Sequence, residues 1–301
     1  MSIDQYLDIR RPEEKTILKV KADPVEALSH AFRMWAACVE KVPEYDELLS
    51  DSRELTRICD LLLAEAEHTS IALPQLLADS AYFIPIDMLP FHHTSYAGLF
   101  YTALLNNGKI DKLVVPDTGV NISFWGYRLS RGTIEIYDSS GIDIGTSMSG
   151  GTIITKGNCE NMIGHNALGG VFINNGECWG LSSESQTGIF INKKTVEWFC
   201  NSPVGGVFIN KGRARNIDID NTNYLLVNYG SVKKIHTALQ SRRVYQEPFI
   251  VYNRRLLSFP KSPSELRTLL DEMHKATKGY TIDEKKVYDI AEKIKGCLHG
   301  N

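Results

Sequence analysis

The sequence lacks the features that would assign it at once to a common functional class. No apolar run approaches the roughly 18 residues of a membrane helix, and the first residues carry acids without an apolar core. We therefore expect neither a membrane span nor a secretory signal. Walker and dinucleotide-binding loops are missing, because the Gly-x-Gly-like pairs precede strand-like segments and do not open helices. The sequence thus predicts no cofactor.

Charge and cysteine usage exclude further classes. The net charge is −3, so no general attraction to nucleic acid is expected, and the basic run from Lys211 to Arg215 is interpreted as a solvated surface. Six cysteines are spread along the chain without a Cys-x-x-Cys pair, which favours buried thiols over a disulfide framework or a zinc site. We predict a cytoplasmic protein that binds neither nucleic acid nor membrane.

The sequence does contain an internal repeat, which runs from about Gly132 to Val232. Its period of 18 to 19 residues is too short for a helical hairpin and suits one coil of a β-solenoid. Glycines recur first at a spacing of 19, and the period becomes 18 near Gly170. Like residues then recur in columns: Val171, Ile189, Val207 and Leu225; Phe172, Phe190, Phe208 and Leu226; Ile173, Ile191, Ile209 and Val227; Asn174, Asn192, Asn210 and Asn228.

Longer helical patterns flank this repeat. Pro24 and Pro263 each stand at the first position of a predicted helix, where a proline is well tolerated. We predict an N-terminal helical region at 1–108, a solenoid at 109–250 and a C-terminal helical cap at 251–301. The predicted fold is mainly β with α: a parallel β-helix of about six coils flanked by N- and C-terminal helices.

The segment from Gly132 to Gly170 resembles the GXGXG repeat family. That family includes the C-terminal domain of the large glutamate synthase subunit and one of the subunits of formylmethanofuran dehydrogenase. The first coil matches the pattern at Gly132, Ile134, Ile136, Gly141, Gly145, Met148, Gly150 and Gly151, and the second at Gly157, Gly164, Gly169 and Gly170. The resemblance covers about a third of the chain. It implies a right-handed β-helix that is mainly structural, so no catalytic residue is carried over from it.

Strand alternation leaves the orientation of the later coils open. We favour the Val and Ile columns pointing inward, because stacked β-branched residues fill a thin core well. The Phe and Asn columns then face outward and need a cover, either the terminal helices or a second copy of the chain. This gives a candidate interaction face: Phe172, Phe190, Phe208, Asn174, Asn192 and Asn210. The opposite orientation places an asparagine ladder inside.

Four polar residues are weaker candidates for a site. His92 and His93 are adjacent, as in some metal sites, but the spacing places no further ligand near them. His165 stands at a corner of a coil that also contains Glu160, and an ordinary solvated turn is the simpler interpretation. No metal site and no catalytic group is predicted from these residues.

The sequence favours a structural or scaffold protein that mediates protein association or self-association and has no catalytic activity of its own. Two alternatives stay open. The first is an enzyme or binding protein that acts on a glycan or small molecule, with its site between the helices and the solenoid. The second is a non-catalytic subunit of a redox or amidotransferase complex. A carboxylate that meets a histidine between helices and solenoid would favour the first alternative.

Overall fold

The computed structural model describes residues 24–43, 52–71, 73, 95–116, 122–137, 141–218, 223–236, 241–245, 249–252, 255–258 and 264–299. The helices are α1 (Pro24–Val39), α3 (Ser52–Ile71), α4 (Ala97–Asn106), α5 (Ser264–Ala276) and α6 (Glu284–His299). The strands are β1 (Lys112–Val115), β2 (Thr133–Ile136), β3 (Thr152–Thr155), β4 (Cys159–His165), β5 (Val171–Asn174), β6 (Glu177–Ser183), β7 (Ile189–Asn192), β8 (Thr195–Asn201), β9 (Gly206–Asn210), β10 (Arg213–Asp218), β11 (Tyr224–Asn228), β12 (Ser231–His236), β13 (Ser241–Tyr245), β14 (Phe249–Tyr252) and β15 (Arg255–Ser258).

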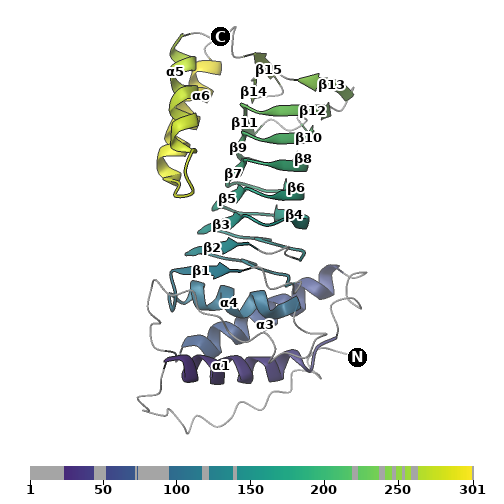
Figure 1. The fold of residues 1–301 in the computed structure, drawn as a ribbon, viewed down its shortest axis with the longest axis vertical. Helices are drawn as coiled ribbons and strands as arrows, with labels where there is room; N and C mark the ends of the chain where they lie inside the picture. Colours follow the sequence, from purple (N-terminus) through teal and green to yellow (C-terminus); the bar gives the residue numbers. More distant parts are fainter. Residues whose placement is uncertain are drawn as a thin grey trace.

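The strands form a parallel solenoid of about six coils, which confirms the predicted fold (Figure 1). A nine-stranded sheet has the order β1-β2-β3-β5-β7-β9-β11-β14-β15, and a six-stranded sheet has the order β13-β12-β10-β8-β6-β4. Each of the later coils contributes one strand to either sheet, so residues one period apart become neighbours. Val171, for example, pairs with Ile189, and Ile189 with Val207. The columns of the repeat are therefore columns of the sheets.

The change of period is located in β4. Cys159 pairs with Cys178 nineteen residues on, whereas Met162 pairs with Gly180 eighteen residues on, and the register shifts between these two pairs. One extra residue in one strand of a pair is a β-bulge, which bends and twists that strand. Coils of 19 residues thus end at this bulge, somewhat before Gly170, and coils of 18 residues follow.

The corner at which β4, β6 and β8 end requires a left-handed backbone. Gly164 occupies it in β4 with φ of 74°, and Gly145 occupies the same corner one coil earlier with φ of 67°. A Cβ on Gly145 would clash with a ring carbon of Phe172, so both positive φ and a crowded interior select glycine here. In the 18-residue coils the same corner holds Ser182 and Cys200 at φ of 67° and 60°.

The Phe column lies inside the solenoid. The rings of Phe172 and Phe190 stack at 4.7 Å and those of Phe190 and Phe208 at 4.9 Å, both nearly parallel. Phe208 also meets Phe199 of the opposite sheet edge-on at 5.8 Å. The prediction that the Val and Ile columns point inward is therefore wrong. The predicted interaction face on the Phe and Asn columns is likewise not a surface, because its six side chains are all buried.

The Asn column forms a ladder at the interior edge of the coils. Nδ2 of Asn174 donates to Oδ1 of Asn192 at 2.9 Å, and the next two steps, to Asn210 and then Asn228, measure 2.8 and 2.6 Å. Thr155 starts the ladder by donating to Asn174 at 3.0 Å. A buried amide is costly unless it is hydrogen-bonded, and each rung supplies the partner of the next.

The Val and Ile columns lie on the outer side of the nine-stranded sheet, where α5 and α6 pack against them (Figure 1). We call this outer side the covered face; it comprises Ile154, Val171, Ile173, Ile189, Ile191, Val207, Ile209, Leu225, Val227 and Ile250. The helices contribute Leu266, Leu269, Leu270, Met273, Val287, Ile290, Ala291 and Ile294. This apolar cluster is separate from the solenoid interior.

Helices α5 and α6 form a helical hairpin, and lysine side chains hydrogen-bond it to one edge of the covered face. Lys211 donates to the carbonyl of His274 at 2.7 Å, and Lys193 donates to the carbonyls of Lys278 and Gly279 at 3.1 and 2.6 Å. These carbonyls lie at the C-terminal end of α5, where a positive charge is favourable. Burial, with the charges of Lys193 and Lys278, lowers the pKa of Lys211 to about 8.

Both ends of the solenoid are occupied by other elements. Helix α4 lies next to β1, and its apolar side chains, Phe100 and Leu104 among them, share one hydrophobic core with the solenoid interior. At the other end β13 pairs antiparallel with β12, and β14 with β11. Helix α4 thus occupies the β1 end of the solenoid, whereas at the other end β15 and β13 are the outermost strands of the two sheets.

Candidate functional site

No helix of the described residues covers the outer side of the six-stranded sheet, and we call this side the open face. In β6, β8, β10 and β12, two consecutive positions stand between inward-facing residues, so both remain outside the core. These positions are Trp179 and Gly180, Glu197 and Trp198, Arg215 and Asn216, and Lys233 and Lys234. The open face therefore has two adjacent columns of outward residues.

The centre of the open face is apolar. Trp179 is 47% exposed, which is unusual for such a large side chain. Trp198 is half-buried on the neighbouring strand, and its ring centroid lies 5.0 Å from that of His236. Met162 packs beside Gly180, since a Cβ on that glycine would lie 3.0 Å from the Met162 side chain. Together Met162, Trp179 and Trp198 form a small apolar centre.

Polar side chains beside this centre hold one another in place. Asn216 donates to Oε1 of Glu197 at 3.1 Å and pairs through its oxygen with Nε2 of His236 at 3.0 Å. Arg215 forms an ion pair with Glu197 at 2.9 Å. The pair is largely exposed, so its contribution to folding stability is small. Its effect is to fix the orientation of side chains around the two tryptophans.

Positive charge borders the apolar centre on β10 and β12. Arg213, Lys233 and Lys234 are exposed, and no side-chain hydrogen bond or ion pair within the described part of the chain engages them. Asp218, the acid on β10, accepts a hydrogen bond from Ser202 at 3.2 Å. The open face thus combines tryptophan, methionine and unneutralised cations.

His165 lies close enough to the carboxyl group of Asp143 to affect it electrostatically, but at a solenoid corner and not between helices and solenoid. Nδ2 of Asn166 lies 3.0 Å from Nε2 of His165, and Nδ1 is buried without a hydrogen-bond partner in the described structure. Burial raises the pKa of Asp143, while the charge of His165 and a hydrogen bond from Thr146 oppose that rise. Nδ1 is without a partner and Nε2 lies beside Asn166, so no hydrogen bond joins His165 to Asp143 in the described structure.

The other predicted polar candidates do not join this pair. His92 and His93 lie outside the described residues. The backbone of Glu160 lies in β4 at the bulge, and its side chain is outside the description. Within the described residues, no group of three or more His, Cys, Asp or Glu side chains is arranged to hold a metal.

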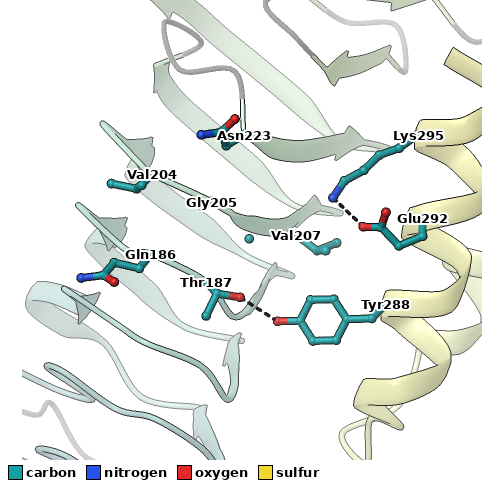
Figure 2. A pocket seen from close by; sticks show the side chains of 10 residues that line it. Gln186, Thr187, Val204, Gly205, Val207, Asn223, Tyr288, Glu292 and Lys295 are labelled. Atoms are coloured by element: carbon teal, nitrogen blue, oxygen red, sulfur yellow. Dashed lines mark hydrogen bonds and ion pairs between the residues drawn. The ribbon is translucent and has the colours of Figure 1, made fainter. Parts of the chain in front are cut away.

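A pocket of about 400 Å³ opens between α6 and the corner that leads into β9 (Figure 2). Its polar residues form their own contacts. Glu292 and Lys295 form an ion pair at 2.7 Å, and Tyr288 accepts a hydrogen bond from the backbone of Gly188 at 3.2 Å. Figure 2 shows Lys295 and Glu292 reaching from α6 towards the solenoid, with Gly205 and Val207 on the other side. The described residues that line this pocket include no histidine.

The comparisons with known proteins do not supply a function. No model of a protein family, no curated protein and no solved structure matches the chain. Among the described helices, none combines the length and apolar character needed to cross a bilayer.

Proposed function

We propose that the protein is a non-catalytic scaffold that binds a partner protein through its open face. The observation that carries this proposal is the contrast between the two outer faces of the solenoid. The chain covers one with its own helices and leaves on the other a large tryptophan that is 47% exposed. Exposed apolar residues mark an interaction site when several lie together within a polar rim, and Trp179 has Met162 and Trp198 on the two adjacent strands.

The composition of the open face supports a protein partner in particular. Aromatic residues, methionine and arginine are enriched in protein interfaces, and energetic hot spots are enriched in tryptophan and arginine. Trp179, Trp198, Met162 and Arg215 are such residues on adjacent strands. The Glu197–Asn216–His236 network holds the neighbouring side chains, which lowers the entropy lost on binding.

The ends of the solenoid favour a different partner over a second copy. Copies of a solenoid associate most simply end to end, by pairing their open strands. Here α4 packs under β1 and occupies that end, so copies cannot continue the solenoid head to tail. We therefore propose a partner with another sequence that binds the side of the solenoid.

The thiols support a cytoplasmic location. Cys159 and Cys178 are paired residues of adjacent parallel strands, and neither forms a disulfide within the described residues. Burial, followed by the effect of Cys159, raises the pKa of Cys178 well above its usual value, so the thiolate needed for redox exchange is disfavoured. We propose that both are core residues of a protein kept in a reducing compartment.

Co-purification from cells that naturally express the protein tests the proposal. The wild-type chain, Trp179→Ser and Met34→Ser would be compared, since Met34 is an equally exposed apolar residue on α1, far from the open face. We expect a partner with wild type and Met34→Ser that is lost with Trp179→Ser. Recovery of the same proteins with all three would contradict the proposal. A dimer that dissociates in Trp179→Ser would show self-association instead.

The pocket beside α6 supports a second candidate function, binding of a glycan or another small polar molecule. Its volume of about 400 Å³ lies within the range of ligand sites, and Lys295 points into it. A ligand that raises the melting temperature of wild type and fails with Lys295→Met would support this function. A catalytic role would further require turnover of that ligand.

If the co-purified partner is a redox or amidotransferase enzyme, the protein is a subunit of the kind that the GXGXG resemblance implies.

A further inference from the structure

We infer that the open face binds an extended acidic segment of the partner, with one bulky apolar side chain seated on Trp179 and acids lying over β10 and β12. The inference rests on the proposed function and adds the chemistry of the bound segment. It combines two observations that are independent of each other, the exposed apolar centre and the unneutralised positive charge beside it.

The sign of the charge comes from the side chains on β10 and β12. Arg213, Lys233 and Lys234 are exposed and unengaged by side-chain contacts in the described structure, while Arg215 is already paired with Glu197. This local excess of cations stands on a chain whose net charge is −3. A segment rich in Asp and Glu complements this region and is guided towards it in a defined orientation.

The spacing of the two regions defines the length of the segment. Trp179 lies on β6 and Lys233 on β12, three strands further along the solenoid in the same column. Strands stand about 4.8 Å apart, so the two positions are separated by roughly 14 Å. An extended chain covers about 3.3–3.6 Å per residue, which makes the separation about four residues. The expected pattern is therefore an apolar anchor with acids three to five positions away.

The same face is poorly suited to a nucleic acid. Single strands bind to rows of aromatic side chains on which successive bases stack. The open face offers one well-exposed ring, because Trp198 is half-buried and packed against His236. A long polyanion would also be repelled by the rest of an acidic chain, whereas a short acidic segment contacts only the cationic region.

Selection from a random dodecapeptide library displayed on phage tests the inference with the full-length chain. Peptides that bind wild type are kept, and those that also bind Trp179→Ser are removed. We expect selected peptides with a bulky apolar residue and at least two acids three to five positions away. Enrichment of neutral or basic peptides, or no enrichment over counter-selection, would overturn the inference. Circular dichroism and solution mass verify that the variant is folded.

Charge reversal separates the inference from the proposed function. Lys233→Glu with Lys234→Glu should weaken binding of a selected peptide at least tenfold, while Lys285→Glu with Lys286→Glu on α6 makes the same charge change elsewhere and leaves it unaltered. If the native partner is lost with Trp179→Ser but retained with the Lys233 and Lys234 reversals, the function stands and the acidic segment is refuted. A single-stranded oligonucleotide that competes with the peptide would also refute it.

Discussion

The two outer faces of the solenoid have the same strand spacing, but only one of them is covered by helices of the described structure. The covered face presents the branched residues of Val-Phe-Ile-Asn repeats to α5 and α6. The open face alternates charged, amide and tryptophan side chains, and no helix of the described structure packs on it. Strand β7 is buried on both sides and is apolar throughout, whereas β10 is buried on one side and carries polar residues on the other. The apolar character of a strand therefore reflects what packs on each side of it.

A charge introduced into the covered face gives the largest expected difference between the two faces. Ile191 is fully buried beneath the hairpin. Ile191→Asp should lower the free energy of unfolding by about 3–5 kcal/mol, the range for an uncompensated buried charge. Chemical denaturation provides the measurement.

Trp179→Asp is the matched variant on the open face. It also replaces a large apolar residue with an acid, and it should cost below about 1 kcal/mol because the position is a surface one. Equal losses for the two variants would show that the faces do not differ in cover.

The next largest loss of stability is expected at the asparagine ladder, which lies in the interior between the two faces. Asn192→Ala removes the acceptor of Asn174 and the donor to Asn210. Asn174 keeps its hydrogen bond to the carbonyl of Gly176, so the main loss is the partner of Asn210. A buried group without its partner costs about 1–3 kcal/mol, and we expect a loss of about 2 kcal/mol. Asn175→Ala, one position beyond the ladder and partly exposed, should stay within about 0.5 kcal/mol. Similar losses would mean that the ladder adds nothing beyond an ordinary amide.

The smallest effect concerns pH at the edge of the covered face. The pKa of Lys211 is lowered to about 8 by burial and by nearby lysines, whereas an unfolded lysine has a pKa of about 10.4. Between these values the unfolded chain binds a proton that the folded chain has released, so stability rises with pH. The stability of wild type relative to Lys211→Met should therefore increase from pH 7.5 to pH 10. A constant difference would show that the lysine is not destabilised by its surroundings.

The sequence predicts the solenoid because its period converts directly into stacked columns. Phe172 and Phe190, eighteen residues apart, are stacked rings in the structure. It predicts the flanking helices from proline at their starts, as α1 begins at Pro24. It does not predict the orientation of the later coils, since apolar residues occupy both alternating positions there and strand alternation alone is symmetrical.

The earlier coils contain the signal that resolves this orientation. Glu135 aligns with Ile154 and then with Ile173, while Ile134 aligns with Ile153 and then with Phe172. A glutamate marks its column as the outer one, so Phe172 belongs to the inner column. The 19-residue coils, aligned with the 18-residue coils, therefore indicate the correct orientation.

The open face leaves a weaker trace in the sequence for a different reason. Two outward residues in succession break the period of two, and the tryptophans stand in neighbouring columns, Trp179 with Glu197 and Trp198 with Asn216. Neither outward column of the open face repeats one residue type, so a search for repeated residues in the sequence does not detect this face. Irregularity within a regular solenoid is itself the signal, because stacking alone does not require it.

The hairpin of α5 and α6 also restricts the number of coils in the solenoid. Removal of residues 189–206 would take out one period and bring Phe172 next to Phe208 and Asn174 next to Asn210, so the columns would continue unbroken. The stacked strands by themselves therefore permit different lengths. The hairpin does not, since the covered face on which its apolar side chains pack runs from Ile154 on β3 to Ile250 on β14 and corresponds to one number of coils. The apolar side chains of the C-terminal helices thus fit a solenoid of this length and not a shorter or longer one.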